Sequence, residues 1–248
     1  MTQDYFIDTH CHLDLFNGIH KSPEIEDKLP IKTITVTNSP NFYEPNTLLF
    51  SGLNNIRVAL GMHPELISKF PKPVSLFEKY IGTTKYIGEI GLDGSKDYEK
   101  TFDLQIQAFE SILSVVKVSG NKILTIHSRH AAKKTIELLQ KHLSGSNCKI
   151  ILHWFSGSLI ELKQAIDYGY FFSINHKMIN SNKGKEIIVK IPKDRLLTET
   201  DAPFTFDNKV SNRLSSLEGT IKGVAEIKNT SYIEIKSLVF SNFKNLLS

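Results

Sequence analysis

Short runs of β-branched and aromatic residues recur along the chain and alternate with longer segments of helical periodicity. Eight such runs read as buried strands. They cover residues 5–9, 31–37, 56–61, 86–91, 123–127, 149–153, 170–174 and 196–200. Consecutive runs begin 21 to 37 residues apart. A strand, a crossover helix and two loops together take about 30 residues, so this spacing predicts repeated βα units.

The segments between the runs carry apolar stripes typical of helices. The stripe in residues 98–119 repeats every three or four positions, which predicts one buried helical face. Its members are Phe102, Ile106, Phe109, Leu113 and Val116. Residues 131–142, 158–168 and 232–247 repeat the pattern. Ser22-Pro23-Glu24 predicts a further helix start, with Ser22 as the N-cap and proline in the first turn.

Eight strands separated by helices predict an α/β fold, a (β/α)8 TIM-type barrel, with residues 1–248 in a single domain. A doubly wound open sheet is the alternative, because it contains the same elements in the same order. No Gly/Ser-rich linker marks a second domain. The longest irregular stretch runs from Pro203 to about Ser216. Its length predicts a segment that contacts a substrate or a partner.

The composition excludes a disordered chain, because 40% of the residues are hydrophobic and 23% are charged. The net charge of +4 is compatible with a polyanionic substrate without requiring one. Cys11 and Cys148 form no disulfide framework, which favours a reducing compartment. Met1 to Asp4 show no charged leader, and no apolar run approaches the ~20 residues of a membrane span. We therefore expect a cytoplasmic protein without a membrane partner.

Histidines gather at the ends of the predicted strands. His10 and His12 are two positions apart in a strand, so they point to one face while Cys11 points away. Such a pair can hold zinc or manganese; the alternative is two hydrogen-bonded histidines in a turn. The other strand ends carry Asn38, His63, Glu89, His127, His153 and Asp201. Because the carboxyl ends of barrel strands form the active site and structural turns rarely use histidine, the set predicts a metal site.

Six of these residues are candidate metal ligands: His10, His12, Glu89, His127, His153 and Asp201. A single catalytic zinc normally takes three protein ligands, so six predict two divalent ions with Glu89 between them. Such a pair can activate a water and stabilise the attacking and leaving oxygens at phosphorus. Mixed imidazole and carboxylate ligands leave magnesium, manganese, zinc and iron open. The residues alone therefore predict a metal-dependent hydrolase.

Six motifs in one order resemble those of the TatD family of metal-dependent deoxyribonucleases. They are Asp8-Thr9-His10-Cys11-His12-Leu13-Asp14, Gly61-Met62-His63-Pro64, Ile87-Gly88-Glu89-Ile90-Gly91-Leu92-Asp93, Ile126-His127-Ser128-Arg129, His153-Trp154-Phe155-Ser156-Gly157 and Leu197-Thr198-Glu199-Thr200-Asp201-Ala202-Pro203. Asn242-Phe243 is similar to the closing helix of that family. The resemblance spans nearly the whole chain and implies a barrel that hydrolyses DNA.

The resemblance also assigns roles. It implies that His10, His12 and Asp201 hold one ion and that His127 and His153 hold the other, with Glu89 shared. Asp201 would also act as the catalytic base for the attacking water.

For two further residues, His63 and Arg129, an alternative to the role implied by the resemblance remains open. His63 would act on the scissile phosphate or the leaving group; alternatively it only caps the turn before Pro64. Arg129 would bind a phosphate through its planar guanidinium, or form a salt bridge on the rim.

Four departures from the family pattern leave the substrate preference open. His130 replaces an acid, Trp154 a cysteine and Gly94 an aromatic residue, and residues 205–209 replace a stretch containing Arg and Asn. None of them removes a ligand. Trp154, Phe204 and Phe206 are candidates to stack on unpaired bases; alternatively they pack over the rim of the barrel.

A narrower resemblance points to the TatD-like nucleases of the Qat anti-phage defence systems of bacteria. It rests on Gly-Leu-Asp-Gly at 91–94, His-Trp-Phe-Ser-Gly-Ser at 153–158 and Glu-Thr-Asp at 199–201. It implies antiviral defence and partner proteins from the same system. Two alternatives remain: a metal-dependent hydrolase of a non-nucleic-acid ester or amide, and a non-catalytic barrel subunit of a defence complex.

Overall fold

The computed structural model describes residues 5–69 and 73–248, and its strands form one parallel sheet of eight strands in chain order. The strands are β1 (Phe6–Cys11), β2 (Ile31–Val36), β3 (Ile56–Met62), β4 (Tyr86–Gly91), β5 (Ile123–His127), β6 (Lys149–His153), β7 (Phe171–Ile174) and β8 (Leu196–Thr198). A doubly wound sheet reverses its strand order at a switch point, and this sheet does not. The predicted TIM-type barrel is confirmed, and the open-sheet alternative is wrong.

Hydrogen bonds across the seam between β8 and β1 bring the two ends of the sheet together. The Thr9 hydroxyl donates to the Thr198 carbonyl at 3.1 Å, and the Thr198 hydroxyl donates to the Ile7 carbonyl. Just beyond the strands, the Asp201 N–H donates to the His10 carbonyl at 2.8 Å. These bonds satisfy backbone groups that an open edge would leave unpaired.

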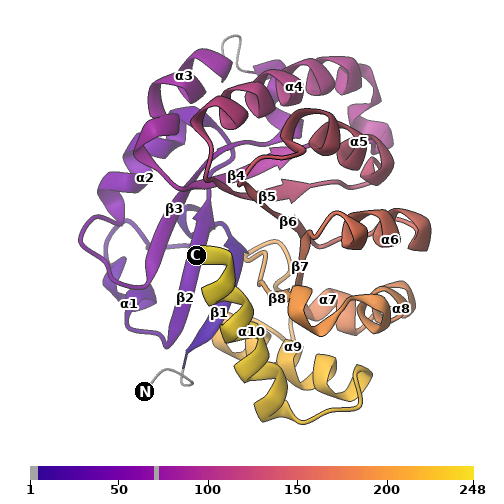
Figure 1. Ribbon diagram of the computed structural model, residues 1–248. Coiled ribbons are helices and arrows are strands. Elements are labelled where there is room, and N and C mark those ends of the chain that lie inside the picture. The colour runs from indigo at the N-terminus through magenta and orange to yellow at the C-terminus, as the bar shows by residue number, and fades with distance from the viewer. Residues whose placement is uncertain (1–4, 70–72) are drawn as a thin grey trace.

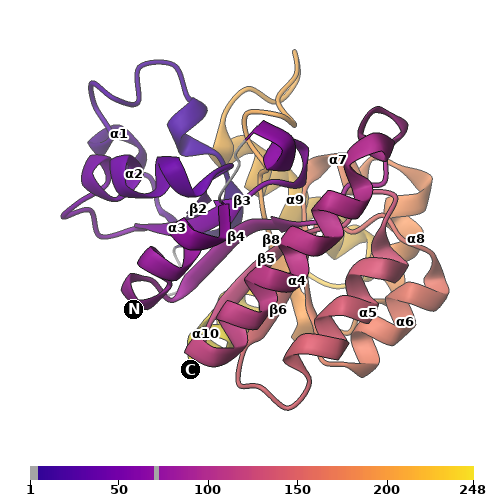
Figure 2. The same cartoon turned by 90° about the horizontal axis from the view of Figure 1, so that it is seen from above.

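Helices surround the strands on the outside (Figure 1). They are α1 (Glu24–Asp27), α2 (Tyr43–Leu49), α3 (Pro73–Tyr80), α4 (Phe102–Ser119), α5 (Ala132–Leu143), α6 (Leu159–Asp167), α7 (His176–Ile179), α8 (Asn182–Lys190), α9 (Arg213–Ile227) and α10 (Tyr232–Leu247). Figure 2 shows α1 to α3 on one side of the strands and α4 to α6 on the other. None of the helices in the described residues is long and apolar enough to cross a membrane.

The helices pack on the strands through the apolar faces that the sequence predicts. Phe109, Leu113 and Val116 of α4 are fully buried. Because helices cover the outside of the barrel and side chains fill its inside, β1 and β2 are buried along nearly their whole length, polar residues included. In α10, the Asn242 amide donates to the Lys193 and Leu196 carbonyls, both at 2.8 Å. These bonds tie the closing helix to the start of β8.

Two sequence-based expectations are wrong in detail. The stretch from Pro203 to Ser216 is not irregular to its end, because α9 begins at Arg213. Local sequence does not indicate a helix start at Arg213, because its guanidinium is bound by Asp8 and Glu26, which lie far away in the sequence. Helix α1 begins at Glu24 with Pro23 in the N-cap position, so Ser22 does not cap it. Both cysteines are free thiols. The expectation about residues 1–4 lies outside the described residues.

Candidate metal centre

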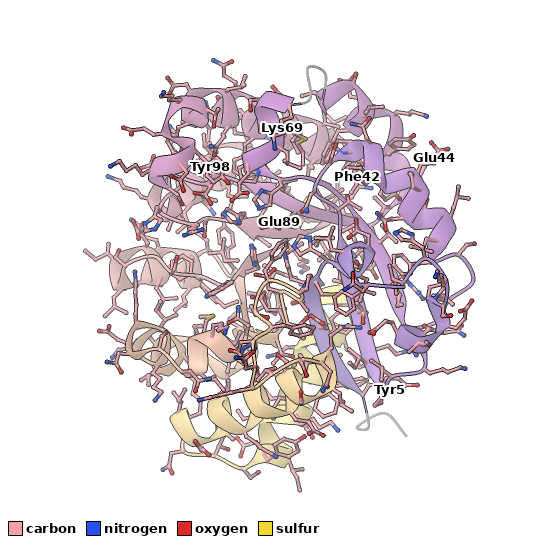
Figure 3. The ribbon with its side chains drawn as sticks, turned by 180° about the vertical axis from the view of Figure 1, so that it is seen from behind. Tyr5, Phe42, Glu44, Lys69, Glu89 and Tyr98 are labelled. Atoms are coloured by element: carbon pink, nitrogen blue, oxygen red, sulfur yellow. The ribbon has the colours of Figure 1, made fainter. Side chains whose placement is uncertain are left out.

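The carboxyl ends of the strands bring the six predicted ligands into one recess. β1 supplies His10, and His12 follows directly after it; β4, β5 and β6 supply one each, and the loop after β8 supplies the sixth. The set is His10, His12, Glu89, His127, His153 and Asp201. Five have side chains at most 8% exposed, and His127 reaches 13%. Figure 3 shows Glu89 near the centre of the molecule, with Tyr5 and Glu44 at its periphery.

The Glu89 carboxylate lies at the centre of this recess, and its Oε1 atom faces three imidazoles. Oε1 lies 2.7 Å from His127 Nδ1 and 2.8 Å from His153 Nε2. The same oxygen lies 3.3 Å from His63 Nε2. The His127 and His153 nitrogens are themselves 3.4 Å apart. The Oε1 atom of Glu89 therefore faces one group of histidines, formed by His63, His127 and His153.

The second oxygen of Glu89 faces a different group. Oε2 lies 3.3 Å from both His10 Nε2 and His12 Nε2. Asp201 Oδ1 lies 3.8 Å from the first of these nitrogens and 3.5 Å from the second. One ligand atom each from His10, His12 and Asp201 fit within 4.8 Å of one another. Glu89 therefore stands between two ligand groups, with one oxygen toward each.

The local backbone aims these side chains inward. The pairing of β1 with β2 shifts between Asp8 and Cys11, and that of β4 with β5 shifts between Ile87 and Ile90. Such irregularities re-aim side chains and recur beside active sites. Asp201 has φ of +49°, a left-handed conformation that Asp tolerates better than most residues.

The recess fits a metal ion. His10 Nε2 is buried and has no hydrogen-bond partner in the described part of the chain, although two carboxylates lie near it. Its other nitrogen, Nδ1, lies 2.7 Å from the Thr125 hydroxyl. A buried nitrogen without a partner needs an explanation, and a bound cation supplies one. The four imidazoles and two carboxylates are ligands that zinc and manganese accept.

The pKa values of these side chains show which of them are free to bind a cation near pH 7. Burial and the neighbouring His153 lower the pKa of His10 to about 4, so this ring is neutral near pH 7. Burial opposes protonation of His12, but Asp201 and Glu89 raise its pKa to about 9. Burial would raise the pKa of Glu89, but His63, His153 and His10 hold it well below the usual range. Glu89 is therefore ionised, as a metal ligand must be.

A family model described as TatD related DNase matches residues 7–248. The chain belongs to the TatD family. An uncharacterized metal-dependent hydrolase of Buchnera aphidicola from Acyrthosiphon pisum is 31% identical over 225 residues, covering 81% of each chain. The human deoxyribonuclease TATDN3 is 24% identical over 255 residues, covering 95% of this chain and 92% of its own. The predicted family is therefore confirmed.

The solved structures support the fold of this TatD protein. The Escherichia coli TatD homologue YjjV superimposes with a TM-score of 0.86, is 24% identical, and is covered over 98% of both chains. A TatD family hydrolase from Entamoeba histolytica gives a TM-score of 0.77 at 20% identity, again with 98% coverage of both chains. At these sequence identities, the similarity shows that the fold is the same and does not by itself show a shared function.

His63 lies at the edge of the recess and presents an N–H to it. The Glu65 N–H donates to His63 Nδ1 at 3.2 Å, so the proton of the neutral ring sits on Nε2. Nε2 faces Glu89 Oε1. The backbone N–H of His63, which follows β3, donates to the carbonyl of Asn38, which lies beyond the end of β2, at 2.9 Å. This bond holds the two loops together. His63 does take part in the turn before Pro64, and it also reaches the site.

The predicted substrate-binding residues lie outside the recess. Arg129 is exposed after β5, and its side chain forms no hydrogen bond or ion pair with the described residues, so the rim salt bridge is absent. Trp154 follows β6 and is 36% exposed. Phe204 is 61% exposed, and its ring meets that of His12 edge-on at 5.0 Å. Phe206 instead packs against Phe16 at 5.9 Å.

Two buried carboxylates in this TatD site were not predicted as site residues. Asp93 Oδ2 lies 2.8 Å from His127 Nε2. Glu199 Oε1 lies 3.8 Å from His153 Nδ1, and the Glu199 carboxylate accepts hydrogen bonds from Ser173 and Asn175. Both belong to motifs that carry the family resemblance. Their positions beside strand-end histidines are the signal that would have identified them.

Proposed function

We propose that this TatD protein is a metal-dependent phosphodiester hydrolase that cleaves DNA with the help of two divalent ions. The observation that carries the proposal is the position of Glu89, with one carboxylate oxygen toward each of two ligand groups. A carboxylate shared in this way is typical of two-metal sites. The family adds support, because its model is described as a DNase.

The six candidate ligands would hold the two ions between them. His10, His12 and Asp201 would hold one ion and His127 and His153 the other, with Glu89 on both. When bound, such ions lower the pKa of a water and neutralise charge on a phosphate.

Protons are moved by the side chains around the ions. Asp201 accepts the proton of the attacking water, because its carboxylate lies beside His10 and His12, 3.8 and 3.5 Å from their Nε2 atoms. His63 donates its Nε2–H to a phosphate oxygen or to the leaving group.

The rim supplies contacts that suit a nucleic acid. Arg129 has a guanidinium free of partners in the described residues, and its planar fork matches a phosphate. Trp154 and Phe204 expose rings on which unpaired bases can stack, at about 1–3 kcal/mol each. The net charge of +4 is compatible with a polyanionic substrate.

End-labelled single- and double-stranded DNA tests the proposal. We expect cleavage with Mg²⁺ or Mn²⁺, loss of cleavage after chelation, and loss in Glu89→Ala. Glu110→Ala is the matched control, because this glutamate lies on α4 far from the recess and pairs with Lys141. Full activity of Glu89→Ala would remove Glu89 from the reaction. Turnover of small esters or amides without DNA cleavage would favour a different hydrolase, and no turnover at all would favour a non-catalytic subunit.

We also propose a role in bacterial anti-phage defence, with partner proteins from a Qat system. The support is the likeness of residues 91–94, 153–158 and 199–201 to nucleases of those systems. Phage plaque counts on bacteria carrying the gene with its neighbours test this role. We expect protection that is lost in Glu89→Ala, and co-purification with the neighbouring gene products. Equal plaque counts with and without the genes would contradict it.

A further inference from the structure

The buried Asp93 lies behind His127, on the side of the ring away from Glu89. Asp93 Oδ2 is 2.8 Å from His127 Nε2, and Glu89 Oε1 is 2.7 Å from His127 Nδ1. His127 is therefore held between two carboxylates, one on each ring nitrogen. In the part of the chain that the structure describes, His153 has a looser version of this arrangement, with Glu89 Oε1 2.8 Å from Nε2 but Glu199 Oε1 3.8 Å from Nδ1.

The Asp93 carboxylate is itself fixed in place. Its Oδ1 accepts the Ser95 N–H at 2.8 Å, which leaves Oδ2 for His127. The Asp93 N–H donates to Gln105 Oε1 of α4, also at 2.8 Å. Asp93 and Gln105 are both 0% exposed. The Leu92 N–H donates to the His127 carbonyl at 3.1 Å, so the two strand ends are joined directly. This carboxylate has no room to turn away.

The chemistry of a fixed carboxylate determines where His127 carries its proton. An ionised carboxylate only accepts hydrogen bonds, so the facing Nε2 must carry a hydrogen. Nδ1 faces the centre of the site, where it lies 2.7 Å from Glu89 Oε1, so a metal ion held there would take the lone pair of Nδ1 while Nε2 keeps its hydrogen. Metal-binding histidines are commonly oriented by such an outer partner.

We propose that Asp93 is a positioning residue that fixes the ring and the tautomer of His127, so that Nδ1 is available to a metal ion. This inference rests on the proposed metal site. It extends that site by a residue that does not itself contact an ion. It also assigns a function to the aspartate of the Gly-Leu-Asp-Gly sequence at 91–94.

Asp93→Asn tests the proposal with almost no change in shape. The amide has one accepting oxygen, and the Ser95 N–H requires it. The amide nitrogen then faces His127 Nε2, which must accept, so the proton of the neutral ring moves to Nδ1. We expect one of two ions to bind about 10- to 100-fold more weakly, with the affinity of the other ion unchanged. Competition with a fluorescent chelator, using Zn²⁺ and Mn²⁺, measures both.

Nitrogen-15 NMR of labelled histidine in the metal-free protein supplies a readout that a merely structural role would not move. We expect Nε2 of His127 to carry a proton in the wild type and to carry none in Asp93→Asn. Glu110→Gln is the control, because it removes the carboxylate beside a histidine far from the site, His142. It should change neither tautomer nor affinity.

Several outcomes would overturn the proposal. One is wild-type metal binding in Asp93→Asn with the His127 tautomer unchanged. Another is a wild-type His127 whose Nε2 carries no proton, which decides the question even if the variant does not fold. If the wild type binds fewer than two ions, the proposed two-ion function fails instead. The tautomer comparison still decides the role of Asp93, because it needs no metal.

Discussion

Thr200 donates two hydrogen bonds to the buried carboxylate of Asp8, from its backbone N–H at 2.9 Å and from its hydroxyl at 2.7 Å. The two residues are 192 positions apart and meet at the seam between β8 and β1. Asp8 lies two residues before His10, and Thr200 lies directly before Asp201. The bonds that close the barrel therefore also set the distance between two candidate metal ligands.

Thr200→Val keeps the shape of the side chain but removes the hydroxyl, which donates to Asp8 and accepts from the Ala202 N–H at 3.3 Å. We expect the free energy of unfolding to fall by about 1–3 kcal/mol, because a buried carboxylate oxygen loses a donor. The ion held by His10, His12 and Asp201 should also bind more weakly. Urea denaturation and chelator competition measure the two effects. Thr47→Val is the control, because the Thr47 hydroxyl only bonds the nearby Glu44 carbonyl; an equal effect there would contradict the prediction.

Arg213→Met removes the buried cation behind the same seam. The Arg213 guanidinium bonds Asp8 at 2.9 Å and Glu26 at 2.8 Å, and its side chain is 1% exposed. Removing one partner of a buried ion pair leaves unpaired charge and costs about 3–5 kcal/mol. We expect a loss of that size in chemical denaturation. Arg195→Met breaks an exposed pair with Asp194 and should cost at most about 1 kcal/mol. Equal losses in the two variants would show that Arg213 is not a structural cation.

Metal affinity should increase with pH. The pKa of His12 in the metal-free site is about 9, so below that pH a metal ion must displace a proton from this ring. The pKa of His10 is about 4, so His10 adds no dependence near neutrality. Burial opposes protonation of His127 and His153, but Asp93 and Glu89 raise the pKa of the first and Glu89 and Glu199 that of the second. We therefore expect the apparent affinity for Zn²⁺ to rise by at least about tenfold per pH unit between pH 6 and 8. Calorimetry in buffers of different ionisation enthalpy should detect proton release, and a flat affinity profile would contradict this.

His63→Ala should reduce DNA cleavage without loss of metal. His63 presents an N–H to the recess rather than a free nitrogen, so it acts as a donor. Loss of a positioned proton donor typically lowers kcat by about 10²- to 10⁴-fold. We expect the metal content to match the wild type, whereas His127→Ala should lose an ion. Metal analysis of both variants, combined with kcat, separates the roles; loss of metal in His63→Ala would make His63 a ligand.

Trp154→Ala and Phe204→Ala should weaken binding of single-stranded DNA. A lost base stack costs about 1–3 kcal/mol, which corresponds to about a 5- to 150-fold rise in Kd. Phe204 is 61% exposed, so the free energy of unfolding should change by at most about 0.5 kcal/mol in Phe204→Ala; Trp154 is 36% exposed, so Trp154→Ala should lose more. Fluorescence anisotropy with catalytically inactive Glu89→Ala protein measures the affinity. Val118→Ala, at a residue 90% exposed on α4, is the control.

The sequence by itself determined the order of the eight strands and the strand-end positions of the six candidate ligands. Both properties are local: a buried strand is a short apolar run, and its last residues face the same end of a parallel barrel. The same locality accounts for the errors. Helix α9 was missed at its start because Arg213 reads as a polar loop residue until its partner Asp8, 205 positions away, is in place.

Only the tertiary structure decided how the candidate ligands divide between the two oxygens of Glu89, and which residues stand behind them. Asp93 and Glu199 are ordinary carboxylates in the sequence, and their proximity to His127 and His153 depends on how neighbouring strands align. Phe204 and Phe206 are two residues apart and equally apolar, yet one is exposed beside His12 and the other packs on Phe16. Such distinctions depend on contacts between distant segments, and local periodicity carries no information about those contacts.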